Sequence, residues 1–405
     1  MNMILIILYV LHFFNDGIRT VFLSLLPFIA KELHLSFTQV GFLGASLGAI
    51  AAIFSIPAGY LALQIGGFRI LFFALLIYSF GAIGLGFAPN FIVIAVLFYS
   101  ASVGFGVFHT IANILVARSI DKAQLGRRMG DFAALGDTGR VLMPIAAIFI
   151  VSHFGWREAF FAVAGLGLIV YLFRWILPLK EHIVHVKTKK SNVSYGEWLR
   201  ELPFFFRQRK LLLVIAAGMI DNLASNPIFV FLPFLLLGRG FSTGMLGIFI
   251  AAFFIGSLFG KFFFGRGVDI FGSRKVFIGA ELSMAITLLV LTVSYNFFLL
   301  LGISLLLGAF TRGTLPVIST LFAKVVHEDH YEKVFAISET MSGIGITIAP
   351  IIAGLIADTF GVVVFFYCAA FFAVAATLPI FALLRDSSLK EQMILSEEKA
   401  AIFDK

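Results

Sequence analysis

The sequence predicts an all-α membrane protein of twelve transmembrane helices, arranged as two parallel repeats of six helices. Three observations lead there: the composition, the number of long apolar segments, and glycines and prolines that recur at a fixed offset. Of the 405 residues, 60% are hydrophobic and only 13% are charged. Soluble domains carry about 45–50% apolar and about 25% charged residues. A water-soluble fold cannot hide so much apolar surface, so the bilayer must surround most of the chain.

This composition excludes a secreted or cytosolic enzyme and a nucleic-acid-binding module. The formal net charge of +8 would suit nucleic acid, but the placement of the basic residues gives it another meaning. Cys368 is the single cysteine, which excludes a disulfide framework and a cysteine metal site. No cofactor and no metal site are predicted, and a His-Glu-x-x-His pattern is absent from the sequence. The first apolar run lacks the basic start of a signal peptide.

Twelve segments are long and apolar enough to cross a bilayer, which takes roughly 20 residues of helix. The predicted spans are about 4–29, 39–62, 69–88, 91–117, 129–152, 158–178, 211–237, 244–264, 275–294, 297–322, 332–357 and 362–384. Their apolar runs are continuous, whereas the strands of a membrane barrel are about ten residues long and alternate in polarity. The chain is therefore expected to cross the membrane as helices.

The basic residues predict the orientation, because cytoplasmic loops collect Lys and Arg. With the N-terminus inside, 24 of the 30 basic residues fall in cytoplasmic segments, Lys261 among them, and three fall on the opposite side. This bias explains the net positive charge without nucleic acid. We expect a multi-pass protein of the bacterial cytoplasmic (inner) membrane with both termini in the cytoplasm.

The two halves of the chain match at an offset of 206 residues. The anchors are glycines and prolines, for example Gly41 with Gly247, Pro144 with Pro350, and Gly155 with Gly361. Because such residues hold one register across five spans, two six-helix halves related by an axis along the membrane normal are predicted. The predicted parts are an N-terminal half (1–178), a polar cytoplasmic linker (179–210), a C-terminal half (211–384) and a cytoplasmic tail (385–405).

A loop signature follows the second span of each half. In the second half it consists of Gly265, Asp269, Gly272, Arg274 and Lys275. This segment closely resembles the loop motif of the major facilitator superfamily. An acid at a helix end can pair with a basic residue or a helix terminus in one state and release it in another, so these residues are predicted to form a cytoplasmic gate. The first-half copy has Leu63 where the acid belongs.

Charged residues inside spans cost about 2.5–3.5 kcal/mol each, so each needs a partner or a water-lined cavity. His12, Asp16 and Arg19 follow at helical spacing in the first span and share one face, with Asn15 beside it. Further polar residues in spans are His109, Asp137, Arg140, Asp221, Asn222, Asn226, Glu281, Arg312 and Glu339. Either they line a central cavity, or they are buried ion pairs that only hold helices together.

The count of charges suggests proton coupling. Asp16, Asp137, Asp221 and Glu339 oppose only Arg19, Arg140 and Arg312. At least one acid therefore lacks a cationic partner, and burial favours its protonated form. Proton coupling is assigned to Asp16 first and then to Glu339, Asp221 and His109. Substrate binding is assigned to His12, Asn15, Arg19, Asp137, Arg140, Asn222, Asn226 and Arg312. The arginines suit an anionic or polar substrate, or act as counter-ions.

Over its whole length the chain resembles the major facilitator superfamily. The first half is similar to the fosmidomycin-resistance type of drug exporter, through the segments His12-Phe-Phe-Asn15-Asp16, Leu35-Ser36-Phe37-Thr38-Gln39-Val40-Gly41, Pro57-x-Gly59-Tyr60 and Gly104-x-x-x-Phe108-His109. Gly354-Leu-Ile-Ala-Asp358 adds a match late in the chain. This resemblance implies proton-driven export of a small toxic compound.

The sequence thus favours a proton-coupled secondary transporter that works by alternating access and exports a drug-like or metabolite solute. The alternatives are a proton-coupled importer of a small organic anion and, in another class, a non-transporting sensor or a channel on the same fold. An enzyme is not expected. The expected partners are a small-molecule substrate, protons and the lipid bilayer, without nucleic acid, and the protein is expected to be a monomer.

Overall fold

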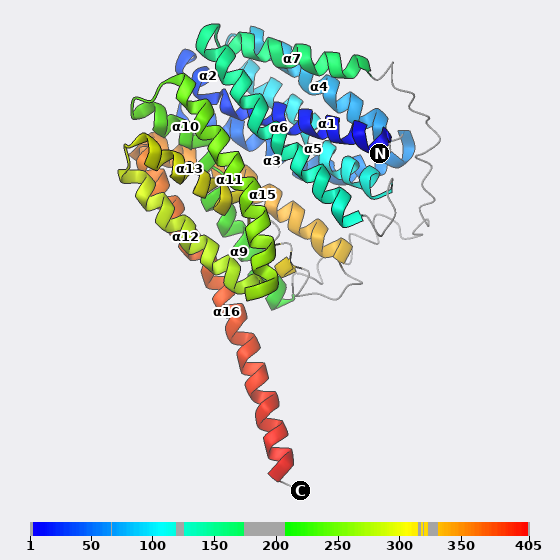
Figure 1. Ribbon diagram of the computed structural model, residues 1–405, viewed down its shortest axis with the longest axis vertical. Helices are drawn as coiled ribbons and strands as arrows, with labels where there is room; N and C mark the ends of the chain where they lie inside the picture. Colours follow the sequence, from blue (N-terminus) through cyan, green and yellow to red (C-terminus); the bar gives the residue numbers. More distant parts are fainter. Residues whose placement is uncertain are drawn as a thin grey trace.

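The computed structural model describes residues 3–65, 67–118, 125–173, 207–314, 317–318, 320–322 and 331–403. In these ranges the chain is helical, with short turns between the helices (Figure 1). The helices are α1 (Met3–Ser24), α2 (Leu26–Glu32), α3 (Phe37–Ile65), α4 (Gly67–Phe87), α5 (Phe91–Arg118), α6 (Leu125–His153), α7 (Trp156–Leu172), α9 (Arg209–Ser225), α10 (Ile228–Gly238), α11 (Thr243–Phe271), α12 (Ser273–Val293), α13 (Phe297–Arg312), α15 (Tyr331–Phe360) and α16 (Val362–Phe403).

Each of the twelve predicted spans overlaps a described helix or pair of helices. Within the described ranges, nine helical segments are long and apolar enough to cross a membrane. Two shorter apolar helices, Phe37–Ile50 and Phe297–Arg312, cover two more predicted spans, and α7 covers the remaining one. The predicted all-α membrane fold is confirmed.

The structure corrects several boundaries. The first predicted span is broken at Leu25 into α1 and α2, next to Pro27 in the first turn of α2. The seventh is broken between α9 and α10, where Pro227 has no backbone N–H to continue the helical ladder. The helix α16 continues past the predicted end of the twelfth span to Phe403 and projects from the body of the molecule (Figure 1). Most of the predicted linker lies outside the described residues.

The sequence repeat is also a structural repeat. The helices α3, α4, α5, α6 and α7 begin at residues 37, 67, 91, 125 and 156, and α11, α12, α13, α15 and α16 begin at residues 243, 273, 297, 331 and 362. Every pair of starts differs by the offset of 206 residues found in the sequence. The two halves therefore place corresponding helices in the same register.

The turns repeat as well, for identifiable chemical reasons. Asn90 and Asn296 occupy equivalent positions, and each accepts a backbone N–H of its helix through Oδ1, at 3.1 Å in both cases. Such side-chain caps satisfy donors that a helix N-terminus leaves free. Gly155 and Gly361, also equivalent, have φ of +115° and +90°. Only glycine adopts this backbone region without strain, so both helix connections depend on it.

The halves pack internally and then against each other. In the N-terminal half α1 packs on α6, α3 on α5, and α4 on α5 and α7; in the C-terminal half α11 packs on α13, while α9 and α12 pack on α16. The main contacts between halves join α3 to α15 and α6 to α11. Gly41 and Gly354 make the first of these contacts close, because a Cβ on either would collide with backbone of the other helix. These two helix pairs form most of the interface between the halves.

Candidate functional site

Asp16 of α1 is the centre of a buried polar cluster. Its Oδ2 lies 2.7 Å from Nη2 of Arg140 on α6 and 3.0 Å from Nε2 of His12. Its Oδ1 lies 3.0 Å from Nε2 of His109 on α5 and accepts a 3.0 Å hydrogen bond from Nδ2 of Asn15. The Asp16 side chain is only 1% exposed. The structure thus brings together the residues of α1, α5 and α6 that the sequence singled out.

Two glycines let α1 and α6 approach closely enough to form this cluster. A Cβ on Gly139 would collide with the backbone carbonyl of Phe13, and one on Gly136 would press on the His12 ring and on Asp16. The His12 ring stacks on Phe132, with ring centroids 3.9 Å apart, and its Nδ1 lies 2.7 Å from the Phe132 carbonyl oxygen. The ring and the carbonyl group of Phe132 together fix the orientation of His12.

A second acid, Asp137, extends the cluster to the other half of the protein. Its Oδ1 accepts a 2.7 Å hydrogen bond from Nη1 of Arg140. Lys261, on α11 of the C-terminal half, donates to Oδ1 and Oδ2 of Asp137 at 2.9 and 2.6 Å. Arg140 therefore bridges two carboxylates, and the second of them is bound by both halves.

Lys261 was missed as a site residue. In the sequence it lies near the cytoplasmic end of a predicted span, where a lysine is expected only to help set the orientation of the helix in the membrane. The available signal was its position inside the predicted span 244–264, three residues before the end. The structure shows that its side chain is directed at Asp137 instead.

Arg19 on α1 and Arg312 on α13 lie near this cluster. Each interacts electrostatically with Arg140 and Asp16, and with the other. Among the described side chains, no carboxylate oxygen lies within 4.0 Å of either guanidinium group. The guanidinium carbon of Arg312 lies over the Phe254 ring, 5.8 Å from the ring centroid. The side chain of Glu339 lies outside the described residues, so its predicted role stays a prediction.

The exposed fractions indicate where this cluster faces. The side chains of His109, Lys261 and Arg140 are 34%, 24% and 13% exposed, and those of Arg19 and Arg312 are also partly exposed. Lys261 and Asp137 meet across the two halves, so the cluster faces the space between the halves rather than lipid.

The residues predicted on α9 lie elsewhere. Asp221 is buried and interacts with Glu281 of α12, not with the Asp16 cluster. Asn222 lies against Gly345 of α15, and Asn226 ends α9 with its backbone N–H on the Asn222 carbonyl. Asp221 and Asp16 occupy adjacent positions in the aligned repeats, yet their surroundings differ.

The predicted gate is mostly helical. Gly265 to Phe271 continue α11 beyond the predicted end of the eighth span, and only Gly272, with φ of +82°, separates α11 from α12. Arg274 and Lys275 then lie in the first turn of α12. The side chain of Asp269 is outside the described residues, so the gate remains a prediction.

One arrangement in the cluster resembles a metal site. Ligand atoms of His12, Asp16 and His109 lie within 4.8 Å of one another. However, Arg140 and Asn15 already contact the Asp16 oxygens, and Arg19 and Arg312 add positive charge nearby. A cation would have to displace the arginine, so these surroundings favour an anion.

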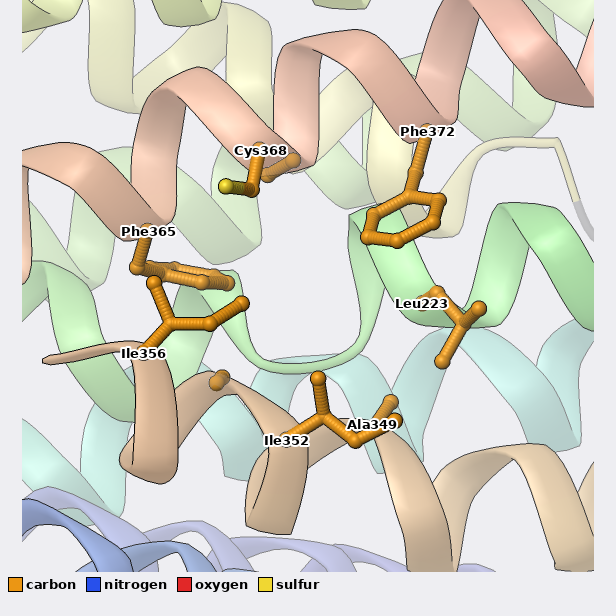
Figure 2. A pocket seen from close by; sticks show the side chains of 9 residues that line it. Leu223, Ala349, Ile352, Ile356, Phe365, Cys368 and Phe372 are labelled. Carbon is orange, nitrogen blue, oxygen red and sulfur yellow. The ribbon is translucent and has the colours of Figure 1, made fainter. Parts of the chain in front are cut away.

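A separate apolar pocket lies in the C-terminal half. Figure 2 shows Phe365, Cys368 and Phe372 of α16 facing Leu223 of α9 and the side chains of α15. Its empty volume is about 200 Å³. Its lining carries no charged group, so it offers nothing to orient a polar substrate. The polar cluster is the candidate functional site.

The sequence model of the Major Facilitator Superfamily matches residues 8–252 and again residues 214–402. The chain belongs to the Major Facilitator Superfamily. The family and the apolar helices long enough to cross a membrane make it an integral, multi-pass membrane protein. The two matches overlap over residues 214–252.

Several named relatives match part of the chain. The cis,cis-muconate transport protein of Acinetobacter baylyi is 29% identical over 164 residues, which cover 40% of either chain. The multidrug resistance protein MdtG of Klebsiella pneumoniae is 27% identical over 261 residues, which cover 63% of this chain and 62% of that protein. The chain thus spans less than two thirds of the length of these relatives.

Solved structures match over nearly the full length. The nucleoside transporter NupG has a TM-score of 0.79 at 15% identity, with 95% of this chain and 99% of NupG covered. A bacterial homologue of the human lysosomal transporter Spinster, crystallised inward-facing and unoccupied, also has a TM-score of 0.79, at 17% identity, with 94% and 96% covered. At these identities the likeness shows the fold of the superfamily.

Proposed function

We propose that this member of the superfamily is a proton-coupled secondary transporter of a small organic anion. The observation that carries the substrate class is an excess of positive charge at the centre of the protein. Four cationic side chains (Arg19, Arg140, Lys261 and Arg312) surround two carboxylates, Asp16 and Asp137. Arg140 and Lys261 are paired, whereas Arg19 and Arg312 have no carboxylate within 4.0 Å among the described side chains, which leaves these two arginines to bind the substrate.

Arginine suits this role. A guanidinium group donates two parallel hydrogen bonds to a carboxylate or phosphate, and two such groups select a substrate with anionic groups at both ends. They come from different halves, Arg19 from α1 and Arg312 from α13. A substrate held by both arginines is therefore released when the halves move apart on one side, as alternating access requires.

Proton coupling is supported by the two ring-nitrogen contacts of His12, one a hydrogen bond and the other a close approach to a carboxylate. A carbonyl oxygen can only accept, so the 2.7 Å contact with Phe132 requires a proton on Nδ1 of His12. The Nε2 atom then faces Oδ2 of Asp16 at 3.0 Å. This contact is attractive only if a proton lies on Nε2 or on the carboxyl group. The pair is thus suited to hold one exchangeable proton, with His109 on the other Asp16 oxygen as a relay.

The named relatives favour two substrate classes. One relative is the cis,cis-muconate transport protein of Acinetobacter baylyi, and a dicarboxylate such as muconate would suit Arg19 and Arg312, one carboxylate for each. Export of a drug-like compound is the second candidate, favoured by the longer match to MdtG. Both candidates use the same cluster and the same fold. We further infer a location in the bacterial inner membrane with both termini in the cytoplasm, from the bias of basic residues, and a monomeric state.

The test is proton flux into liposomes that contain the purified protein and a pH-sensitive dye. Solutes to compare are cis,cis-muconate, benzoate, fosmidomycin, a neutral drug-like compound and a neutral nucleoside. We expect an anion to start proton movement and the nucleoside to be inert. The Asp16→Asn variant should lose the coupling, whereas the surface variant Glu158→Gln should keep it.

Two results would reject this function. Flux of the anion without proton movement would indicate a uniporter or a channel. Proton flux that responds only to neutral drug-like compounds would favour the second candidate. The sign of the imposed pH gradient that drives accumulation distinguishes import from export.

A further inference from the structure

A second pair of buried acids lies in the C-terminal half, outside the Asp16 cluster. Glu281 of α12 is 0% exposed and Asp221 of α9 is 4% exposed, and the two side chains interact with each other. Both carboxylate oxygens of Glu281 and Oδ1 of Asp221 have no hydrogen-bond donor among the described residues. Unpartnered buried oxygens are costly, and each calls for an explanation.

Basic residues on the helices packed around this pair do not neutralise it. Lys261 of α11 binds Asp137, and Arg312 of α13 interacts with the Asp16 cluster. Arg266 of α11 lies over the Phe262 ring, with its guanidinium carbon 3.9 Å from the centroid. On α16 the described titratable groups are Tyr367 and Cys368, and on α15 Asp358 is bound to α3. Ser225, one turn after Asp221, is the recorded polar neighbour besides Glu281.

Two ionised carboxylates cannot face each other in such a place. Like charges in a dry interior repel strongly, and paired acids respond by keeping a proton between them. A carboxylic acid also supplies the donor that the unpartnered oxygens lack. The pair is stable if the O–H of one carboxyl group donates to a carboxylate oxygen of the other.

The repeat shows that packing alone does not require these acids. Glu281 is equivalent to Leu75 of α4, which is likewise fully buried, and Asp221 is equivalent to Asn15 of α1. The N-terminal half thus fills the same two positions with a leucine and an amide. The C-terminal half therefore carries two extra titratable groups, and their chemistry needs another explanation than the fold.

We propose that Asp221 and Glu281 form a second proton-binding site, in which the two carboxyl groups share one exchangeable proton. The ligand is the proton, and no covalent step is involved. The site is separate from Asp16 and does not depend on the identity of the transported solute, so it goes beyond the function proposed above. A transporter with both sites holds a proton in each half.

Infrared difference spectroscopy tests this proposal on the full-length protein in lipid. A buried carboxylic acid gives a C=O stretching band that shifts in heavy water and disappears when the proton is lost. In an Asp16→Asn background, we expect this band to remain at neutral pH and to disappear at high pH. It should be lost in Glu281→Gln combined with Asp221→Asn. A band unchanged by that double substitution would overturn the proposal, as would a band that responds to Na⁺ at fixed pH.

Thermal unfolding at several pH values gives a second, independent measurement. A pair that holds a proton in the folded state loses it on unfolding at neutral pH, so the folded state binds more protons and its stability falls as pH rises. In the double variant, the slope of the unfolding free energy against pH should change by the equivalent of about one bound proton. Glu281→Leu copies the equivalent Leu75 and shows whether the position tolerates an apolar side chain. An identical slope for the wild type and the double variant would contradict the shared proton.

Discussion

Asp358, in the C-terminal half, binds the first turn of α3 in the N-terminal half through Thr38. Its Oδ2 accepts hydrogen bonds from the backbone N–H and the hydroxyl group of Thr38, at 2.7 and 2.6 Å, and its Oδ1 accepts one from the backbone N–H of Phe37 at 2.6 Å. The start of a helix has free N–H groups and a partial positive charge. One half of the protein thus supplies the N-cap of a helix in the other, and this contact closes one end of the space between them.

Replacing Asp358 with alanine should weaken this closed end. The loss of a charged cap costs about 1–2 kcal/mol at an exposed position, which corresponds to roughly a 5–30-fold change in a conformational equilibrium. Spin labels at Lys31 and Thr359, in a protein whose Cys368 is replaced by serine, measure the opening. We expect a longer distance population to grow in Asp358→Ala and to grow less in Thr38→Val.

The control for this experiment is Glu158→Ala. Glu158 is an exposed acid in the first turn of α7, on the same side of the protein, and it is not bonded to the other half in the described structure. This variant should leave the distance distribution unchanged. If Asp358→Ala also leaves it unchanged, the cap does not control the opening.

Much of the fold could be predicted from the sequence because the bilayer fixes the length of the spans and glycine, asparagine and proline fix the turns. The offset of 206 residues reappears in five pairs of helix starts and in the caps Asn90 and Asn296. The breaks at Leu25 and before Pro227 were not predicted, because the first lies inside an apolar run and the second inside a segment that is apolar enough on average to be one span. Hydropathy reports burial in lipid and is insensitive to a single irregular turn.

The candidate site was predicted in part. Asp16, His12, His109 and Arg140 stood out because ionisable groups in a span are costly, and the structure joins them. The contact of Asp137 with Lys261 was not predicted. These residues are 124 positions apart, and they meet only because α6 and α11 pack with these two side chains facing each other. The partner of Asp221 was missed for the same reason. Spacing along one helix predicts a shared face, but not which helix faces it.

The contact between Lys261 and Asp137 leads to a second prediction. Lys261→Met keeps the length of the side chain but leaves Asp137 without its partner from the C-terminal half. We expect substrate-driven proton flux to fall by tenfold or more, since truncating one member of a hydrogen-bonded charge pair costs about 2–5 kcal/mol when buried. Lys261→Arg should retain most of the flux. The surface variant Lys31→Met is the control, and wild-type flux in Lys261→Met would refute the role of the contact.

Arg19 and Arg312 lead to a third prediction. Arg19→Gln or Arg312→Gln should raise the KM for the anionic substrate by roughly 10–150-fold, because a hydrogen bond to a charged group contributes about 1.5–3 kcal/mol. A lysine at either position should give an intermediate KM, since an ammonium group lacks the planar fork of guanidinium. Initial rates of labelled anion uptake measure these values. Arg157→Gln is the control. Arg157 pairs with Glu32, with Nη2 and Oε1 2.7 Å apart, and this pair is not part of the Asp16 cluster.

A fourth prediction concerns the glycines that bring α11 and α13 together. A Cβ on Gly308 would collide with the backbone carbonyl of Phe253, and one on Gly256 would collide with that of Leu305. A backbone cannot yield as a side chain does, so Gly308→Ala should destabilise the protein by about 1–3 kcal/mol and lower its Tm in detergent by several degrees. Gly302, in the same helix, is exposed and has no atom within 4 Å of such a Cβ. There alanine should raise stability by up to about 1 kcal/mol, as it does in a helix without crowding. Equal effects of the two substitutions would show that the crossing of α11 and α13 is looser than described.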